Sequence, residues 1–309
     1  MPKFDFVGRR KLFLTISGAL ILISVLCTVI FGVEIDIEFK GGTIINYSYD
    51  GDIEIDDFDS KVEELIDDSV NITQGEDFNT GRNSIQITFV SEDGLTADKQ
   101  FELTNGLQEA FQGNNLELIS SSDVNPASGR DFLNKCLVAV GVAAVILILY
   151  IAWRFKRISG WSAGVMAIVA LLHDIFMVFG TFVILQIPIN SNFMAVVLTI
   201  LGYSINDTIV IYDRIRENKK IMDKKTPIAE LVNLSINQSL TRSINTSLCT
   251  VISMIVVSIV AAALHVESIL SFSIPMTIGI ITGAYSTICI AGPLWVWWQE
   301  RKTGKAAKA

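Results

Sequence analysis

The sequence predicts a membrane protein: an all-α six-helix transmembrane bundle with one extracytoplasmic α+β domain. Three observations support this fold class. Half of the 309 residues are hydrophobic, and mean hydropathy is +0.48. Six apolar runs approach the ~20 residues that a helix needs to cross a hydrocarbon core of ~30 Å. Between the first two runs lies a polar segment, 34–131, that is about the size of a small independent fold.

The six apolar runs are predicted to be spanning helices. They lie at about 12–33, 133–153, 161–185, 191–212, 244–265 and 270–298. The last run is long enough to tilt or kink, and Pro275 is the candidate kink site. The first run follows three basic residues, as a secretory signal does, but it is too long for one and lacks a small-residue cleavage motif. We therefore expect 1–33 to form an N-terminal tail and a retained first helix, and 132–299 to hold the other five helices.

Charge is distributed unevenly among the polar segments. Segment 34–131 holds 23 acidic and 5 basic residues, whereas the whole chain has a net charge of only −8. The other polar segments are basic, namely 1–11, 154–157, 213–242 and 300–309. Since basic loops stay on the cytoplasmic side, we expect both termini in the cytoplasm and 34–131 outside it. All five tryptophans lie near predicted cytoplasmic ends of spans, where aromatic rings favour the interface.

Cysteine and histidine are too few and too scattered to predict a metal centre. The four cysteines all fall within predicted spans, which makes a disulfide framework improbable, and the only histidines are His173 and His265. The sequence shows no phosphate-binding loop, and the outer segment shows no pair of nucleophile and base. We therefore expect no cofactor, no bound metal, no enzymatic activity and no nucleic-acid partner.

The outer segment is predicted to alternate strands and helices. Side chains alternate along Thr43–Tyr49, which indicates a strand with one covered face, and Ser84–Val90 and Leu116–Ser121 indicate further strands. Helical spacing of apolar residues runs from Phe58 to Ile66 and, less regularly, from Phe101 to Phe111. These elements predict a compact α+β domain, and solubility outside the cell best explains its acidic surface.

A carboxylate stands inside the fourth predicted span. An acid near mid-membrane costs roughly 2.5–3.5 kcal/mol to insert, so Asp207 is expected to have a function. Thr199, Tyr203 and Asp207 recur every four residues and therefore share one helical face. The predicted hydrogen-bonding neighbours of the acid are Tyr203, Ser204, Asn206 and Thr208. The pattern predicts a buried proton or ion site.

The fifth predicted span carries a complementary polar stripe. Its members recur at three- and four-residue steps: Arg242, Asn245, Thr246, Cys249, Thr250 and Ser253. Asp207 and Arg242 lie near the inner ends of antiparallel spans, so we expect them to meet at similar depth and to change protonation as helices move. Purely structural explanations of these residues stay open. The acid could be a fixed ion-pair partner, the arginine could reach lipid phosphates, and the small hydroxyl residues could serve only close packing.

A second ionisable pair, His173-Asp174, lies midway along the third predicted span. It is predicted either to belong to a proton relay or to be a satisfied polar contact. The basic loop 213–243 is expected in the cytoplasm. Thr226-Pro227 suits a helix start there, so we predict an amphipathic helix on the inner membrane surface, where lipid head groups account for the charges at least as well as a protein partner does.

Four segments together resemble the SecD/SecF family of bacterial protein-export membrane subunits, part of the resistance-nodulation-division superfamily. They are Gly202–Asn218 (GYSINDTIVIYDRIREN), Arg242–Ser247 (RSINTS), Leu172–Asp174 (LHD) and Phe39–Thr43 (FKGGT). The first is long and specific, and the likeness extends over all six predicted spans and their loops. One departure is Glu38, because the family often has Asp at that position.

The resemblance implies a SecF-like half that pairs with SecD as a heterodimer and associates with the SecYEG channel. It implies that the complex uses the proton-motive force to assist preprotein translocation across the cytoplasmic membrane of a bacterium. Asp207 would be the proton-carrying carboxylate and Arg242 its basic partner, with sodium replacing the proton in some members. Asn245 and Thr246 are expected to give polar support, and the translocating preprotein and membrane lipids are the remaining expected partners.

Two other classes of function remain open to the sequence. Small-molecule efflux pumps of the same superfamily usually carry two six-span halves in one chain, so this chain would be a half-transporter of that type. A non-transporting assembly factor would use Asp207 and Arg242 only to hold helices together, and it would function normally after both charges were removed.

Overall fold

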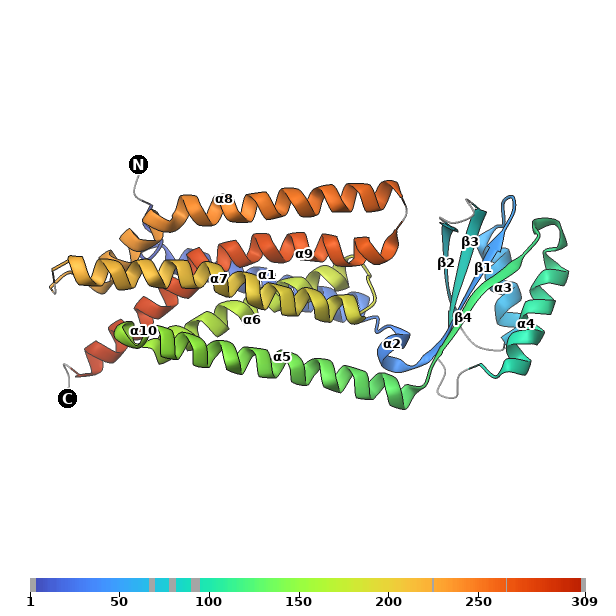
Figure 1. Cartoon of the computed structure of the whole chain (residues 1–309), viewed down its shortest axis with the longest axis horizontal. Coiled ribbons are helices and arrows are strands. Elements are labelled where there is room, and N and C mark those ends of the chain that lie inside the picture. The colour runs from blue at the N-terminus through green and yellow to red at the C-terminus, as the bar shows by residue number, and fades with distance from the viewer. Residues whose placement is uncertain are drawn as a thin grey trace.

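The computed structural model describes residues 4–66, 70–77, 82–89, 95–223, 225–264 and 266–306. A long helical bundle carries a small sheet domain at one end, and both chain termini lie at the other end (Figure 1). Within the described residues, six helical segments are long and apolar enough to cross a membrane. The predicted fold class, a six-helix bundle with one α+β domain, is confirmed.

The six spans follow the predicted order. They are α1 (Arg10–Phe31), α5 (Pro126–Arg154), α6 (Gly160–Ile184), α7 (Ser191–Ile221), α8 (Ile228–Ala263) and a sixth span made of α9 (Glu267–Ser286), a π-helical turn η3 (Thr287–Ala291) and α10 (Gly292–Ala306). The apolar windows of α1, α5 and α8 are each only 11% buried, against 50% for α6, 56% for α7 and 61% for the sixth span. The last three therefore form the centre of the bundle.

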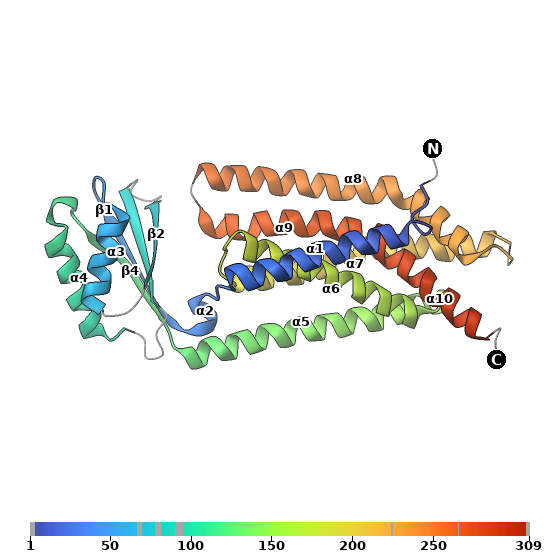
Figure 2. The same cartoon turned by 180° about the vertical axis from the view of Figure 1, so that it is seen from behind.

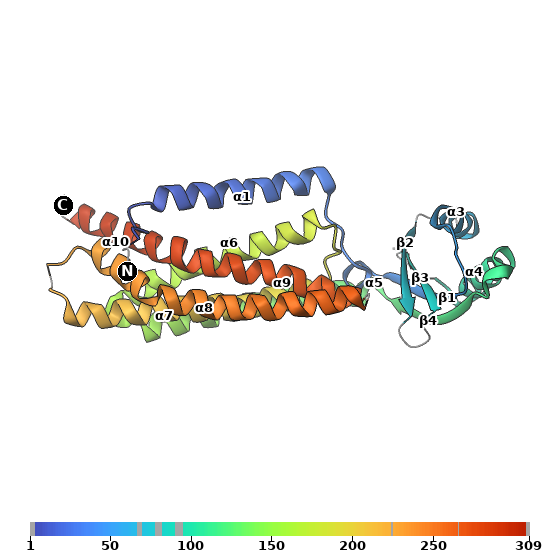
Figure 3. The ribbon, with the colours of Figure 1, turned by 90° about the horizontal axis from the view of Figure 1, so that it is seen from above.

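The helices around this centre lie on different sides of it. Figure 3 shows α1 on one side of the bundle, where it packs along α6, whereas α5, α7 and α8 lie on the other side. The sixth span departs from α-helical geometry at η3, and Figure 2 shows a bend between α9 and α10. Pro275 lies within α9, which continues through it. A π-helical turn inside a helix often marks a functional position.

The prediction of a separate amphipathic helix on the membrane surface is wrong. Helix α7 continues to Ile221, and α8 begins after Pro227 and runs unbroken to Ala263. The apolar side chains Leu231, Val232 and Ile236 are buried in the core of the bundle rather than free to lie on lipid. Burial of these side chains in a helical hairpin removes more apolar surface from water than a surface position would.

The outer domain is a four-stranded antiparallel sheet with two helices on one face. Its strands are β1 (Gly42–Tyr49), β2 (Val70–Asp77), β3 (Arg82–Phe89) and β4 (Glu117–Val124), in the order β2-β3-β1-β4. Helices α3 (Ile55–Ile66) and α4 (Ala97–Ala110) cover the face turned away from the bundle (Figure 1). Buried Ile45, Phe58 and Leu107 belong to the core between these layers. Strand β2 was not predicted, and Val90, the last residue of the predicted strand Ser84–Val90, lies outside the described residues.

The chain enters and leaves the outer domain through a tight junction. Gly42 has a φ of +144°, and a Cβ there would meet the backbone oxygen of Phe89. Gly41, with a φ of +88°, lies against Pro126 at the start of α5. The short helix α2 (Ile37–Lys40) packs on α5, with Phe39 and Phe132 ring centroids 5.6 Å apart. Glycine is required here because no other residue allows this backbone conformation at such close approach.

The same junction is hydrogen-bonded to the start of α7. The Ser191 amide donates to Glu38 Oε2 at 2.8 Å, the Ile189 amide donates to the Glu34 carbonyl at 2.9 Å, and the Asp36 amide donates to the Ile189 carbonyl at 3.1 Å. The Asn190 side chain caps the helix by accepting from the Asn192 amide. Helix α7 is thus fastened at its first turn to the base of the outer domain.

Candidate functional site

Asp207 lies on the face of α7 that meets α8. It is 4% exposed, and its Oδ2 accepts one long hydrogen bond, 3.5 Å, from Ser247 Oγ on α8. The Tyr203 hydroxyl lies 3.4 Å from both Ser247 Oγ and Thr250 Oγ1 and can donate to either. Of the polar stripe predicted on the fifth span, only Thr250 meets the fourth-span stripe, at Tyr203, and the contact to Asp207 comes from Ser247, which that stripe did not include.

Arg242 interacts with Asp207 only through space. Among the described residues no ion pair joins the two side chains, and Arg242 is exposed on α8, five residues before Ser247. Its charge nevertheless acts electrostatically on the Asp207 carboxylate. The direct contact that the stripes predict is not formed here, because Ser247 occupies the position opposite Asp207.

The other predicted supporting residues on these helices face outward. Asn206, Asn245 and Thr246 are all exposed, and the Thr246 hydroxyl donates to the Arg242 carbonyl of its own helix at 2.9 Å. The structure does not bring these three side chains to Asp207. With exposed Arg242 they give α7 and α8 a polar outer face, hereafter the polar face, on a bundle whose other exposed side chains are mostly apolar.

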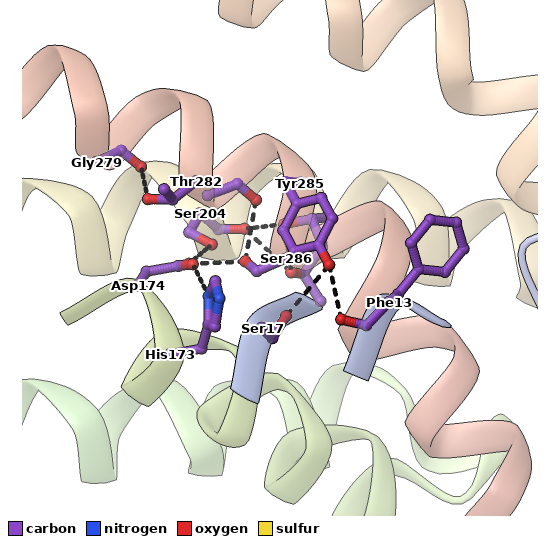
Figure 4. Close-up of polar contacts among 12 residues, drawn as sticks. Phe13, Ser17, His173, Asp174, Ser204, Gly279, Thr282, Tyr285 and Ser286 are labelled. Atoms are coloured by element: carbon purple, nitrogen blue, oxygen red, sulfur yellow. Dashed lines mark hydrogen bonds and ion pairs between the residues drawn. The ribbon is translucent and has the colours of Figure 1, made fainter. Parts of the chain in front are cut away.

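His173 and Asp174 form a separate polar cluster in the centre of the bundle (Figure 4). Asp174 is fully buried, and its Oδ2 accepts hydrogen bonds of 2.8 Å from Ser204 Oγ on α7 and from Ser286 Oγ on α9. Its Oδ1 lies 3.1 Å from His173 Nδ1. One carboxylate therefore joins three helices of the bundle centre. In contrast with Asp207, it has a donor on both oxygens.

Ser204 and Thr208 belong to this central cluster, which corrects their predicted place around Asp207. Ser204 bonds to Asp174, whereas the Thr208 hydroxyl donates to the Ser204 carbonyl at 3.0 Å and lies 3.3 Å from Thr287 Oγ1. Adjacent residues point about 100° apart around an α-helix. Tyr203 and Asp207 therefore face α8, while Ser204 and Thr208 face α6 and the sixth span.

Sequence reasoning did not assign site roles to Ser247, Ser286 and Thr287. Ser247 stands in the RSINTS segment next to a predicted site residue, so its signal was present. Ser286 and Thr287 are an adjacent hydroxyl pair in the apolar sixth span, a weaker signal that depends on knowing which helix faces them. Within the described part of the chain, no group of three or more His, Cys, Asp or Glu side chains could hold a metal ion.

Comparisons with known proteins agree with this architecture. The family profile "Protein export membrane protein SecD/SecF, C-terminal" matches residues 104–301. The chain is 32% identical to the protein translocase subunit SecF of Alicyclobacillus acidocaldarius, over 99% of this chain and 96% of that protein. It is 33% identical to SecF of Petrotoga mobilis, over 99% of this chain and 100% of that protein.

Solved structures extend the likeness to the fold. The chain superimposes on the crystal structure of SecDF, a translocon-associated membrane protein from Thermus thermophilus, with a TM-score of 0.79 at 30% identity. The match covers 97% of this chain and 39% of SecDF. A SecDF protein of Bacillus subtilis is 33% identical over 98% of this chain and 39% of its own length. On this profile, these identities and this coverage, the chain belongs to the SecD/SecF family of protein-export membrane proteins.

Proposed function

We propose that this chain, a SecF-like accessory subunit of the Sec export machinery, works with SecD to convert the proton (or sodium) motive force into movement of its outer domain during preprotein translocation. The observation that supports this most is a buried carboxylate, Asp207, on the helix whose first turn is bonded to the base of that domain. A charge inside a membrane protein that is held by a single long hydrogen bond can change its protonation at little structural cost.

Helix α7 supplies the mechanical link in this proposal. When Asp207 takes up a proton, it loses its charge and its attraction to Arg242, so the α7–α8 contact through Ser247 is free to shift. The start of α7 is hydrogen-bonded to Glu38 and Glu34 at the base of the outer domain, so a movement of α7 is transmitted to these two residues. Each elementary charge that crosses the membrane supplies ~2.3 kcal/mol per 100 mV, so several protons provide enough work to reposition a small domain.

Partner assembly in this proposal uses the polar face. Asn206, Arg242, Asn245 and Thr246 would be costly against lipid, because hydrocarbon offers no hydrogen-bond partners. Full-length relatives that carry SecD and SecF in one SecDF chain support SecD as the covering partner. The SecYEG channel and the translocating preprotein are the further partners that a Sec export subunit would contact.

The proposed orientation places both termini in the cytoplasm and the sheet domain outside the cell. The structure's arrangement suits it, since both termini lie at one end of the bundle and the acidic domain at the other (Figure 1). The polar ends of α7 and α8 carry the basic residues of 213–243, which favours a cytoplasmic position for that end.

The test replaces Asp207 by asparagine in the complex with SecD and SecYEG, reconstituted into vesicles. We expect Asp207→Asn to remove the part of preprotein export that depends on the ion gradient, because the amide cannot take up a proton, while export without a gradient stays unchanged. A matched control is Thr181→Val, since among the described residues the Thr181 hydroxyl bonds only to the Met177 carbonyl of its own helix, at 2.9 Å. Unaltered gradient dependence in Asp207→Asn would reject the proposal.

A further inference from the structure

The most deeply buried acid of the bundle is not the one that the proposed function uses. Asp174 is 0% exposed and Asp207 is 4% exposed. Asp174 is bonded to α7 and α9, whereas Asp207 is bonded to α8. We propose that His173 and Asp174 together form a second proton-binding site, at which one proton enters on His173 Nε2. This inference deepens the proposed ion coupling, and rests on it for its purpose in the protein.

The hydrogen bonds of Asp174 indicate how its protons are arranged. Its two oxygens receive Ser204 Oγ and Ser286 Oγ at 2.8 Å and His173 Nδ1 at 3.1 Å. In the ionised form of Asp174 the carboxylate can only accept, so in that form His173 donates from Nδ1–H. A neutral imidazole that donates from Nδ1 carries a lone pair on Nε2, and the pair, whose side chains are shown in Figure 4, then holds one net negative charge.

His173 Nε2 is the atom that is open to a proton. It is buried, and within the described residues it has no hydrogen-bond partner. A buried polar atom without a partner costs free energy and calls for an explanation. If a proton binds Nε2, the pair becomes neutral in either of two forms, imidazolium beside carboxylate, or neutral imidazole beside a protonated Asp174. Nε2 carries a hydrogen in both forms, so the protonation of Nε2 reports proton uptake by the pair in either case.

The surrounding helices offer no cation to balance Asp174. Helix α6 has no charged residue besides this pair, and the charged residues of α1, Arg10 and Lys11, lie at its first turn. Those of α5 lie at its two ends, α9 has only Glu267 in its first turn, and η3 has none. Helix α7 adds Asp207, a like charge three residues from Ser204, and its remaining charged residues begin at Asp213, whereas the charged residues of α8 are Glu230 and Arg242. These helices also carry tyrosines and cysteines, and of these Tyr285 packs against the pair, with its ring 5.9 Å from the His173 ring.

Without a counter-ion, a proton is what can neutralise the pair. A lone negative charge in the membrane interior is costly, and a bound proton removes that cost. A proton needs no cavity of its own. The two serine hydroxyls already occupy the positions around Oδ2 that an additional cation would take. The chemistry of the cluster therefore fits a proton better than a metal cation such as sodium.

The cluster contacts other helices, so proton uptake can alter the packing between helices. The Tyr285 ring lies 5.9 Å from the His173 ring, and its hydroxyl donates to the Phe13 carbonyl on α1 at 2.9 Å and lies 3.2 Å from Ser17 Oγ. A new Nε2–H requires an acceptor, so proton uptake calls for a rearrangement of the side chains around the His173 ring, of which Tyr285 is one. Proton uptake would therefore change contacts to α1, which leads into the outer domain, and through Ser204 to α7.

The test is nitrogen-15 NMR of the histidine side chain in the full chain, held in lipid bilayers. The variant His265→Gln leaves His173 as the only histidine, so every signal comes from the pair. We expect Nε2 to be unprotonated at the high end of a pH series from about 9 to 4 and protonated at its low end. An Nε2 whose protonation is the same across that range would overturn the proposal.

Further arms of the experiment separate the alternatives. Asp174→Asn is expected to lower the protonated population of Nε2 about tenfold at a given pH, because the neutralising carboxylate is lost, whereas Thr181→Val leaves it unchanged. Sodium added at constant pH should leave the spectrum as it is, and a sodium-dependent shift would reject a proton site in favour of a cation site. If Asp207→Asn leaves export unaltered while Nε2 still titrates, the proposed function fails and the proton site stands.

Discussion

Two buried carboxylates on neighbouring spans are held in opposite ways. Asp174 receives three hydrogen bonds of 3.1 Å or less from α6, α7 and α9, whereas Asp207 receives one of 3.5 Å from α8. The first acid joins the three best-buried spans of the bundle, and the second lies beside the polar face, where a partner is expected. The difference indicates that a fully bonded acid holds helices together, while a loosely bonded one leaves its helix free to move.

The outer domain shows a third arrangement of an acid. Asp50 pairs directly with Arg82, Oδ1 to Nε at 2.8 Å, and Arg82 also reaches Glu117 at 2.7 Å. Water surrounds these groups, so an ion pair costs little to form and contributes little. In the membrane, by contrast, Asp207 and Arg242 stay apart. A direct ion pair there would fix the two helices, which is unsuitable for a site that must change its charge.

The largest expected effect is on stability, through Asp174. Asp174→Ala leaves Ser204, Ser286 and His173 without their shared acceptor, so we expect the free energy of unfolding to fall by about 3 kcal/mol. Asp207→Ala should cost less than about 1 kcal/mol, because only one long bond is lost. Chemical denaturation of the two variants in the same detergent measures both values. Equal losses would break the contrast between the two acids.

A pair of serine substitutions tests the same contrast with smaller changes. Ser204→Ala removes a 2.8 Å bond to a buried carboxylate and is expected to lower the free energy of unfolding by about 1.5 kcal/mol, whereas Ser247→Ala removes a 3.5 Å contact and should cost about 0.5 kcal/mol or less. The same denaturation measurement compares them, since both exchanges delete one buried hydroxyl. A larger cost for Ser247→Ala would show that Asp207 is held more firmly than its geometry indicates.

The smallest effect is expected in the outer domain at acid pH. Hydrogen bonds from Arg82 hold the pKa of Asp50 below its ordinary value of 3.8. A lowered folded-state pKa means that the stability is present above the unfolded value and is lost as the pH falls below it. Below about pH 4 the protection factors of β1 and β3 amides, from which the intrinsic pH dependence of exchange is removed, should therefore fall slightly, and Asp50→Asn should remove that change. Persistence of the change in Asp50→Asn would assign it to other acids.

Sequence patterns predicted what depends on local composition. The number of spans, the presence of the outer domain and Asp207 as a charge in an apolar run follow from hydropathy, which sums over neighbouring residues. Strand β2 was missed because its eight residues include a glycine and several polar side chains, and it is stabilised by pairing with β3 rather than by its own pattern. The first part of α8 was wrongly predicted to be a separate surface helix, because an apolar stripe suits a helix on the membrane surface as well as one packed in a helical hairpin.

The sequence by itself therefore determined that six helices cross a membrane and that acids stand inside two of them. Only the tertiary structure decided which partners those acids have. Ser204 and Thr208 lie within three residues of Asp207 along the chain. The packing of α6 and the sixth span against α7 nevertheless makes them part of the Asp174 cluster. Hydropathy is a local sum, whereas a hydrogen bond between helices depends on how each helix is rotated against neighbours that are distant in the chain.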